Sequence, residues 1–282
     1  MISDSLPLTR RVMLASLAIP LFAQQKIKLG CQTNAWPIHP ADSQTLFAAL
    51  KDIHSLGFAG FETGFANVMP LAAKPDQLRA QRQGMVPFGV HIFLTHYDPE
   101  TSVAPADLIT KVASVGATMG FRHLILSDAP ASDAAALSNK VAELNRYAKQ
   151  VSDLGLKLAY HNHGPEFTGA NPEIEGLLSE TDPALVAFLL DAGHAFDAGA
   201  DVVTFVNRHY SRLTGLHLRD YLNGKQVPLG QGSFPLAALA RALRANNWSG
   251  WALAEEERLD GSKLGDAAAR PAYQALQQAF SV

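Results

Sequence analysis

After Gln25 the sequence alternates short apolar segments with longer segments of helical periodicity, and it does so eight times. The short segments carry few charges, as expected of strands whose two faces are both covered. They are Ile27–Thr33, Phe58–Thr63, Val86–Ile92, Arg122–Ser127, Leu156–His161, Leu185–Asp191, Leu213–Leu218 and Gly250–Glu255. Strands that alternate with helices form parallel sheets, and eight such units favour closure over an open sheet. The sequence therefore predicts an α/β fold, specifically a (β/α)8 TIM barrel.

The segments between these strands have the periodicity and the end signals of helices. Ser43–Leu56 places its apolar side chains on one stripe and is followed by Gly57, a residue typical of a helix C-terminus. Ala134–Leu154 also ends before a glycine, and Pro235–Ala245 begins with proline in the first turn. The 282 residues suit one barrel of ~250 residues. No linker marks a second domain, so we expect a single domain over residues 26–282.

Residues 1–25 have a different character. Arg10 and Arg11 are followed by the apolar run Val12–Ala23, whose 12 residues suit a signal peptide and are too few to span a bilayer. This pattern predicts a twin-arginine signal, export and, after cleavage, a periplasmic protein that is not held in the membrane. The alternative is an N-terminal amphipathic helix that packs on the barrel.

Charge and cysteine content argue against two kinds of site. Lys and Arg number 23 against 26 Asp and Glu, the formal net charge is −3, and no basic block is present. A nucleic-acid partner is therefore not expected. Cys31 is the single cysteine, which excludes an internal disulfide and a metal site with paired thiolates. Any metal ion must be held by histidine and carboxylate side chains.

Polar residues gather where the predicted strands end. The C-terminal ends of barrel strands meet at one rim, where enzymes of this fold have their active sites. Here the rim receives histidines, carboxylates and one arginine: Glu62, His91, His161, His163, Asp191, His194, His217, Arg219 and Glu255. Nitrogen and oxygen ligands without thiolates suit one divalent ion of Mn, Co, Zn or Fe with open coordination positions.

Some of these residues also have a purely structural interpretation. Glu62 could form a salt bridge at the rim, His91 could be a core histidine, and Asp191 could cap a turn. The triplet His161-Asn162-His163 is harder to explain in this way, because strand alternation puts both histidines on one side. Of the three glutamates at positions 255–257, at least one or two are expected to be solvated surface residues.

Six motifs, spread from residue 57 to residue 255, occur in a recognisable order. They are Gly57-Phe58-Ala59-Gly60-Phe61-Glu62, Tyr160-His161-Asn162-His163 with Glu166-Phe167, Asp191-Ala192-Gly193-His194, His217-Leu218-Arg219-Asp220-Tyr221, Pro228-Leu229-Gly230-Gln231-Gly232, and Gly250-Trp251 leading to Glu255. In these motifs the chain resembles the xylose isomerase-like TIM barrels, the sugar phosphate isomerase/epimerase superfamily. This superfamily includes inosose dehydratases and ketose 3-epimerases.

The resemblance implies a metal site and substrate contacts. In the family's ketose epimerases the last four strands supply Glu, Asp, His and Glu ligands, and the matching positions here are His161, Asp191, His217 and Glu255. His161 thus replaces a carboxylate that, in those epimerases, also exchanges a proton with the substrate. The residues expected to contact substrate are His91, Glu166, His194 and Arg219.

We interpret the chain as a metal-dependent sugar isomerase or epimerase that abstracts the proton beside the metal-bound carbonyl of a keto-sugar. Glu255 is expected to act as acid and base and His163 as the second base, with Glu62 as a further catalytic residue. Glu62 or Glu166 could instead orient His163 or hold substrate hydroxyls.

Three alternatives to this interpretation remain open. The same site could serve a lyase or dehydratase of a keto-sugar or keto-glycoside, or the barrel could bind sugar without catalysis. An apurinic endonuclease of the endonuclease IV type is disfavoured by the acidic balance of charge. The expected partner is a small-molecule carbohydrate, and homo-oligomer formation is left open.

Overall fold

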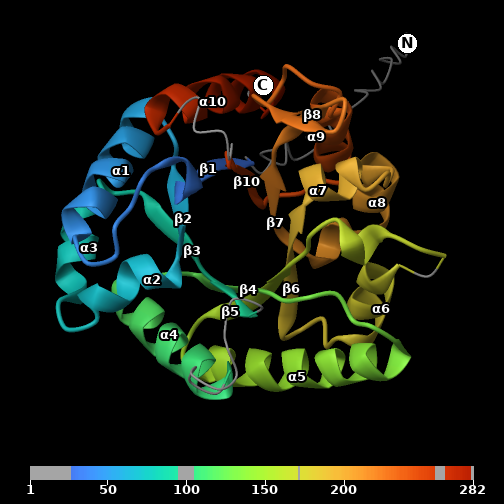
Figure 1. Ribbon diagram of the computed structural model, residues 1–282, viewed down its shortest axis with the longest axis horizontal. Helices are drawn as coiled ribbons and strands as arrows, with labels where there is room; N and C mark the ends of the chain where they lie inside the picture. Colours follow the sequence, from blue (N-terminus) through green and yellow to red (C-terminus); the bar gives the residue numbers. More distant parts are fainter. Residues whose placement is uncertain (1–26, 95–104, 171, 258–263, 281–282) are drawn as a thin grey trace, which may run out of the picture.

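The computed structural model describes residues 27–94, 105–170, 172–257 and 264–280 (Figure 1). Within these residues, parallel strands close into a barrel in the order β1-β10-β7-β6-β5-β4-β3-β2. The barrel strands are β1 (Lys28–Gln32), β2 (Gly60–Gly64), β3 (Val86–Phe93), β4 (His123–Ser127), β5 (Lys157–His161), β6 (Val186–Asp191), β7 (Leu213–Leu218) and β10 (Trp251–Ala254). The predicted (β/α)8 barrel is therefore confirmed.

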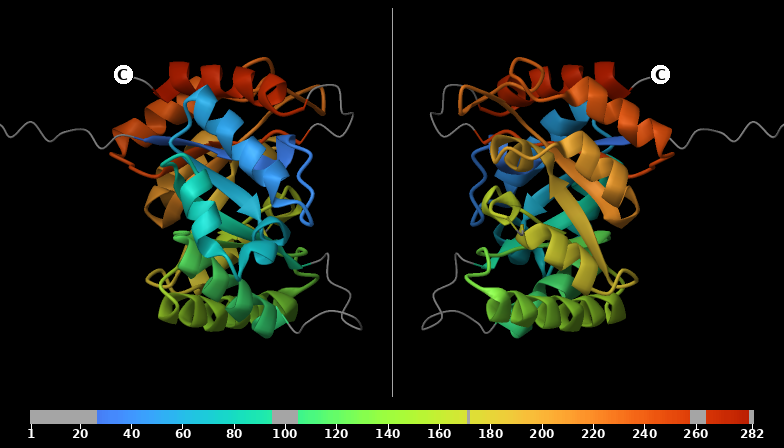
Figure 2. Two further views of the ribbon diagram at one scale, coloured as in Figure 1. Left: turned by 90° about the vertical axis from the view of Figure 1, so that its left-hand side faces the viewer. Right: turned by 90° about the vertical axis from the view of Figure 1, so that its right-hand side faces the viewer.

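A ring of helices covers the outer face of the barrel (Figures 1 and 2). Its members are α1 (Ser43–Leu56), α3 (Pro75–Gln81), α4 (Pro105–Met119), α5 (Ala134–Asp153), α6 (Glu173–Glu180), α8 (Val202–His209), α9 (Leu236–Ala245) and α10 (Asp266–Phe280). Short helices α2 (Phe65–Val68) and α7 (Ala192–Asp197) directly follow β2 and β6, and 3-10 turns η1 (Thr33–Ala35) and η4 (Pro165–Phe167) follow β1 and β5. A small antiparallel hairpin, β8 (Asp220–Leu222) with β9 (Lys225–Val227), follows β7.

The predicted elements agree with the observed ones to within two residues at most ends. The helix predicted at Ser43–Leu56 has the same bounds, with Gly57 in the left-handed conformation after it. The largest shift among the strands is in β2, which begins at Gly60 instead of Phe58. The predicted signal peptide lies outside the described residues and stays a prediction. Among the described helices, none is both long and apolar enough to cross a membrane.

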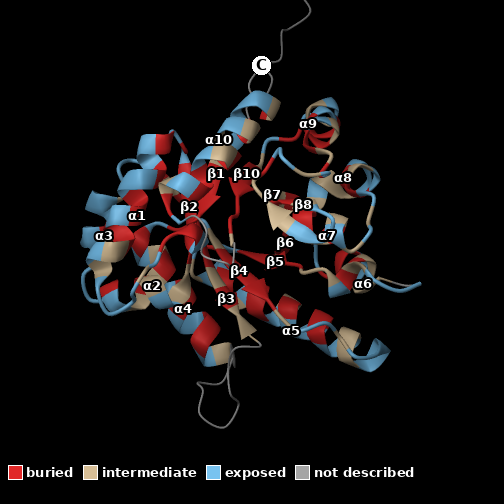
Figure 3. Cartoon of the chain, turned by 45° about the horizontal axis from the view of Figure 1, so that its top comes forward, coloured by how far each residue is buried: buried red, intermediate tan, exposed pale blue. Residues whose placement is uncertain are grey.

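Apolar side chains fill the barrel beneath its C-terminal rim. The strands themselves are largely buried (Figure 3). The interior cluster is Phe88, Ile125, Ala159, Ala187, Leu189, Trp251 and Leu253. Since every second residue of a strand points to the same face, the next inward residues along β5, β6 and β10 are His161, Asp191 and Glu255. The sequence thus places its polar residues on top of an apolar floor, where they are partly shielded from water.

Candidate metal centre

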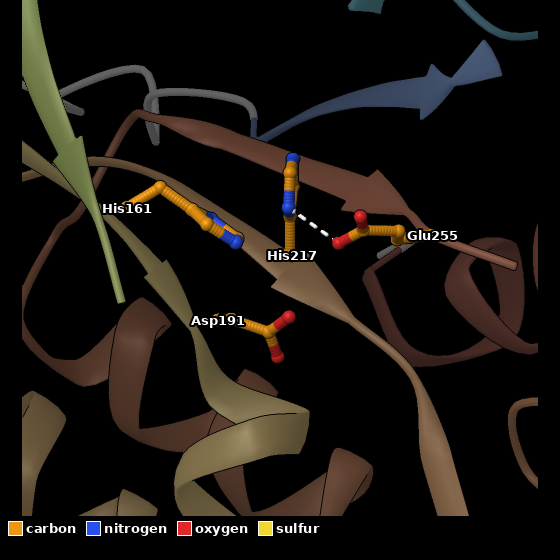
Figure 4. A group of neighbouring side chains, drawn as sticks. All are labelled: His161, Asp191, His217 and Glu255. Carbon is orange, nitrogen blue, oxygen red and sulfur yellow. Dashed lines mark ion pairs between the residues drawn. The ribbon is translucent and has the colours of Figure 1, made fainter. Parts of the chain in front are cut away.

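Four side chains from adjacent strands converge at the rim (Figure 4). His161 ends β5, Asp191 ends β6, His217 lies one residue before the end of β7, and Glu255 directly follows β10. Their exposed fractions are 3% or less. Each offers one ligand atom, and these atoms all lie within 4.8 Å of one another. The four residues that the family resemblance assigned as ligands therefore form one buried cluster.

The hydrogen bonding of the cluster fits a metal ion. Each residue has one buried polar atom that makes no hydrogen bond of acceptable geometry: His161 Nδ1, Asp191 Oδ2, His217 Nδ1 and Glu255 Oε2. Three of these atoms face charged neighbours, whereas His161 Nδ1 has no ion-pair partner among the described residues either. A buried polar atom is rarely left in that state, because its desolvation is not compensated. Ligand bonds of roughly 2.1 Å to a divalent cation separate two donors by up to about 4.2 Å, so small side-chain adjustments would complete the site.

Arg219 lies beside the cluster and is also buried. Its Nη2 is 3.1 Å from Asp191 Oδ2 and 2.6 Å from Glu255 Oε2, while Nη1 is 3.1 Å from Glu257 Oε2. Burial would raise the pKa of the Glu255 carboxyl group, but Arg219 and His217 outweigh that effect and hold the pKa well below its usual range. Glu255 is thus kept as a carboxylate, the form that both a ligand and a general base require.

The histidines of the cluster have opposite electrostatic surroundings. Burial lowers the pKa of His161 well below its ordinary value, which keeps its ring neutral and able to coordinate. Burial acts in the same direction on His217, but Glu255 and Glu62 together raise the pKa of His217 well above the ordinary value. The His217 ring lies between these two carboxylates, with Nδ1 2.5 Å from Glu255 Oε2 and Nε2 2.8 Å from Glu62 Oε2.

A cavity of about 470 Å³ opens beside the cluster. The predicted site residues in its wall are His91, His161, His163, Arg219 and Glu255. The rest of the wall is formed by Gln32, Asn34, Gly64, Phe65, Ala66, Asn67, Phe93, Ser127 and Glu257. Its volume lies within the ~300–1,000 Å³ typical of small-molecule sites. A polar wall on one side and phenylalanine rings on another suit an amphipathic ligand.

A family model described as Xylose isomerase-like TIM barrel matches residues 50–279 of the sequence. The chain belongs to this family. An inosose dehydratase of Lactiplantibacillus plantarum is 31% identical over 139 residues, which are 43% of this chain and 46% of that protein. The match thus spans less than half the length of this relative.

Solved structures of other proteins share the fold over 89–91% of this chain. A sugar phosphate isomerase/epimerase from Parabacteroides distasonis has a TM-score of 0.74 at 17% identity, over 89% of this chain and 98% of that one. The apo 3-keto-D-glucoside 4-epimerase of E. coli has a TM-score of 0.69 at 16% identity, over 90% and 99% of the two chains. The IOLI protein with a binding zinc atom has a TM-score of 0.73 at 16% identity, over 91% and 100%. At these identities the likeness shows the fold alone.

His163 faces the cavity, as the alternation of the His161-Asn162-His163 triplet predicts. Its ring centroid is 5.1 Å from those of His161 and Phe93. Burial, with His194 alongside, lowers the pKa of His163 to about 4, so the ring is neutral near pH 7. Asn162 points away and exchanges hydrogen bonds with the backbone of Asp191, at 2.9 and 3.1 Å. These bonds tie the ends of β5 and β6 together.

Glu62 does not reach the cavity, which differs from its expected role as a catalytic or substrate-holding group. Its side chain is completely buried behind His217, with Oε1 3.2 Å from His91 Nδ1. The register of β2 against β3 shifts between Phe61 and Glu62, and this irregularity sets where the carboxylate lies. Glu62 contacts two imidazoles and does not contact His163.

Glu166 also lies elsewhere than predicted. It is fully buried in η4, where it accepts hydrogen bonds from the Tyr160 hydroxyl at 3.0 Å and from the backbone N–H of His163 at 3.1 Å. Its carboxylate therefore holds the His163 backbone from behind and forms no part of the cavity wall. Glu166 comes shortly after the end of β5, as the sequence suggests, but η4 directs its carboxylate toward Tyr160 and the His163 backbone instead of the cavity.

His194 lies next to the cluster instead of in the cavity wall. Its Nε2 is 3.7 Å from Asp191 Oδ2, and its Nδ1 is 3.3 Å from the Tyr221 hydroxyl. Asp191 also accepts a hydrogen bond from the backbone N–H of His194 at 2.7 Å, so the N-cap interpretation of Asp191 is correct alongside its place in the cluster.

The sequence did not single out five polar residues of the wall: Gln32, Asn34, Asn67, Ser127 and Glu257. Gln32 and Ser127 end β1 and β4, so the strand-end rule could have found them. Asn34 donates to Glu255 Oε1 at 3.3 Å and also to Glu257. The expectation of solvated glutamates holds only in part, because Glu255 and Glu256 are buried and Glu257 is half-exposed.

Proposed function

We propose that the protein is a metal-dependent enzyme that removes the carbon-bound proton beside the carbonyl of a keto-sugar and returns a proton to give an isomer or epimer. The observation that carries this proposal is the buried cluster of His161, Asp191, His217 and Glu255, two of which, His161 and Glu255, line a sugar-sized cavity. The E. coli relative of this fold is a 3-keto-D-glucoside 4-epimerase, which supports a keto-sugar as the substrate class.

The cluster residues would hold the ion, and the remaining wall residues would handle the proton. When bound, a divalent cation polarises a carbonyl and its neighbouring hydroxyl and stabilises the negative charge that develops on proton loss. Glu255, kept ionised by Arg219, is the base on one side of the cavity. His163, neutral and held by Glu166 through its backbone, is the proton-transfer group contributed by the end of β5.

A second candidate is elimination of a β-substituent, as in a dehydratase or lyase. It is favoured by the unlike chemistry of Glu255 and His163, since His161 stands where the family's ketose epimerases carry a carboxylate. Two similar carboxylates on opposite sides of a substrate can each remove or return a proton, as epimerisation requires. One carboxylate and one imidazole instead suit elimination, in which one group removes a proton and the other protonates the leaving group. The inosose dehydratase that matches part of the chain supports this candidate.

Metal analysis and deuterium exchange test the proposal. Protein purified without chelator should contain about one divalent ion per chain, and His217→Ala should contain none. His209→Ala is the matched control, because His209 contacts Glu175 on the outer surface and lies away from the cluster. Full metal occupancy in His217→Ala would refute the ligand assignment.

Incubation with 3-keto-glucosides, ketohexoses and inososes in D2O then identifies the reaction. Deuterium beside the carbonyl with a new stereoisomer supports epimerisation, and an unsaturated or dehydrated product supports elimination. His163→Gln should lower the rate about 100-fold or more with metal retained, as for loss of a general acid or base. If the protein binds metal but exchanges no deuterium into any of these sugars, the proposed enzyme function is refuted and the alternative of a barrel that binds sugar without catalysis remains.

We propose further that the barrel acts outside the cytoplasm, on a free sugar or glycoside. The support is the Arg10-Arg11 pair with its apolar run. Cell fractionation of the full chain should find wild type in the periplasm and the Arg10→Lys, Arg11→Lys double variant in the cytoplasm. Equal distribution of the two would contradict the twin-arginine route.

A further inference from the structure

The Glu62 carboxylate lies between two imidazole rings that come from different strands. On one side Oε2 is 2.8 Å from His217 Nε2, in a hydrogen bond of good geometry. On the other side Oε1 is 3.2 Å from His91 Nδ1, a contact at ion-pair distance. The opposite nitrogen of His91, Nε2, is 2.8 Å from the Ser127 hydroxyl in the cavity wall. A chain of contacts thus runs from Ser127 through Glu62 to the cluster residue His217.

The chemistry of these groups fixes where the protons lie. An ionised carboxylate only accepts hydrogen bonds, so the ring nitrogen that faces it must carry the hydrogen. Nδ1 of His217 also faces a carboxylate, Glu255 Oε2 at 2.5 Å, so the same rule gives it a hydrogen until a metal ion displaces that hydrogen. With the ion bound, the ring would be neutral, keep its hydrogen on Nε2 toward Glu62, and offer the Nδ1 lone pair to the ion. The same rule puts a hydrogen on His91 Nδ1 and lets His91 Nε2 accept from Ser127.

We propose that Glu62 is a positioning residue which holds His217 in the tautomer and ring orientation that direct Nδ1 to the metal. This inference rests on the metal site of the proposed function. Glu62 has no exposed surface, and a fully buried carboxylate is retained at a cost unless its partners compensate it. Outer carboxylates that orient a ligating histidine change metal affinity by about 10–100-fold when they are removed.

The alternative is a purely structural role, in which Glu62 only stabilises the fold through its contacts with His217 and His91. The two roles predict different results for Glu62→Gln, which keeps the size of the side chain. An amide presents one oxygen and one NH2 group, so it cannot accept from both imidazoles at once. One of the two rings must then present a lone pair to the amide, and the His217 tautomer is no longer fixed.

The test is a Zn²⁺ affinity measurement by chelator competition, combined with ¹⁵N spectra of histidine-labelled protein. In wild-type protein loaded with Zn²⁺, His217 should show a protonated Nε2 and a metal-bound Nδ1. In Glu62→Gln we expect the affinity to fall at least 10-fold and the protonated Nε2 signal to weaken. Glu173→Gln is the matched control, because it breaks another shielded ion pair, with Lys140 at 2.5 Å, on the outer side of the barrel.

The outcomes separate this inference from the proposed function. If the ¹⁵N spectra of the wild-type protein show Zn²⁺ bound to Nε2 of His217, the inference is overturned. This result needs no variant, so the test remains decisive even if Glu62→Gln does not fold. Unchanged affinity in Glu62→Gln, or an equal loss in Glu173→Gln, would overturn it as well, while the metal-dependent function would stand. A wild-type protein that binds no divalent metal would overturn both.

Discussion

Gly193 allows Arg219 to lie beside the cluster, and adding one methyl group there should damage both stability and metal binding. Gly193 is in the first turn of α7, within the Asp191-Ala192-Gly193-His194 motif. A Cβ atom on Gly193 would overlap Arg219 Cγ and lie 3.0 Å from the Arg219 carbonyl oxygen. The clash involves the stem and the backbone of a side chain that is 3% exposed, so Arg219 cannot simply swing into solvent.

The size of the effect follows from opposing contributions. Alanine favours a helix over glycine by up to about 1 kcal/mol, which would stabilise the variant. Overpacking a buried site costs about 1–3 kcal/mol. Displacing Arg219 from Asp191 and Glu255 leaves buried charges unpaired, which costs about 3–5 kcal/mol when a pair is fully broken. Partial displacement gives a net destabilisation of about 2–4 kcal/mol for Gly193→Ala.

Thermal denaturation and Zn²⁺ titration measure this effect. For a domain of this size, we expect the Tm to fall by roughly 4–16 °C, and the metal affinity to fall with it. Gly164→Ala is the matched control, because its Cβ would lie 3.6 Å from Ala198 and its backbone is right-handed helical, with φ −62° and ψ −44°. That variant should be neutral or more stable by about 0.4–1 kcal/mol. If Gly193→Ala were as stable as Gly164→Ala and bound metal normally, the close packing against Arg219 would not matter and the reasoning would be wrong.

Three further changes have expected outcomes. Asp220 accepts backbone N–H groups of Tyr221, Gly230, Gly232 and Phe234 at 2.8–2.9 Å, so Asp220→Asn should cost about 2–4 kcal/mol and speed proteolysis of residues 228–234. Burial lowers the pKa of His123 to about 4 from 6.5, so below pH 6.5 the unfolded chain binds a proton that the folded chain does not, and stability falls as pH is lowered. That loss should reach roughly 3 kcal/mol near pH 4, and His123→Asn should abolish it in urea titrations; an unchanged pH dependence would contradict the assignment. His161→Glu, which restores the ligand type of the ketose epimerases, should shift metal preference from Zn²⁺ toward Mn²⁺ in competition assays.

The fold was predictable because eight strand segments alternate with helical segments, and the apolar residues of each follow the period of a β-strand or of an α-helix. The cluster His161, Asp191, His217 and Glu255 was predictable for two reasons: strand ends of a barrel meet at one rim, and the motifs resemble a known family. Local sequence patterns place each of these residues correctly along its own strand. They do not say which side chains touch across the barrel, because that depends on strand register.

The two carboxylates that lie elsewhere than expected depend on such register or on a local turn. Glu62 lies behind His217 because β2 and β3 slip by one position at Phe61, which no pattern in the sequence reveals. Glu166 turns inward because η4 begins immediately before it at Pro165. In each case a carboxylate near the rim was expected in the cavity and instead supports a histidine of the site, His217 in the cluster or His163 in the cavity wall.

The sequence resemblance places His161 where the family's ketose epimerases have a carboxylate, and this difference changes the charge balance of the cluster. Three fully buried carboxylates contact His217 or Arg219, namely Glu62, Asp191 and Glu255, and Arg219 is the one fixed cation among these groups. Without the half-exposed Glu257, which also contacts Arg219, their sum is −2, and a divalent cation that displaced the Nδ1 hydrogen of His217 would neutralise it. A fourth carboxylate at position 161 would leave an excess negative charge in a site with little solvent to screen it. The neutral imidazole of His161 therefore matches a centre in which Glu62, although not a ligand, already supplies one of the negative charges.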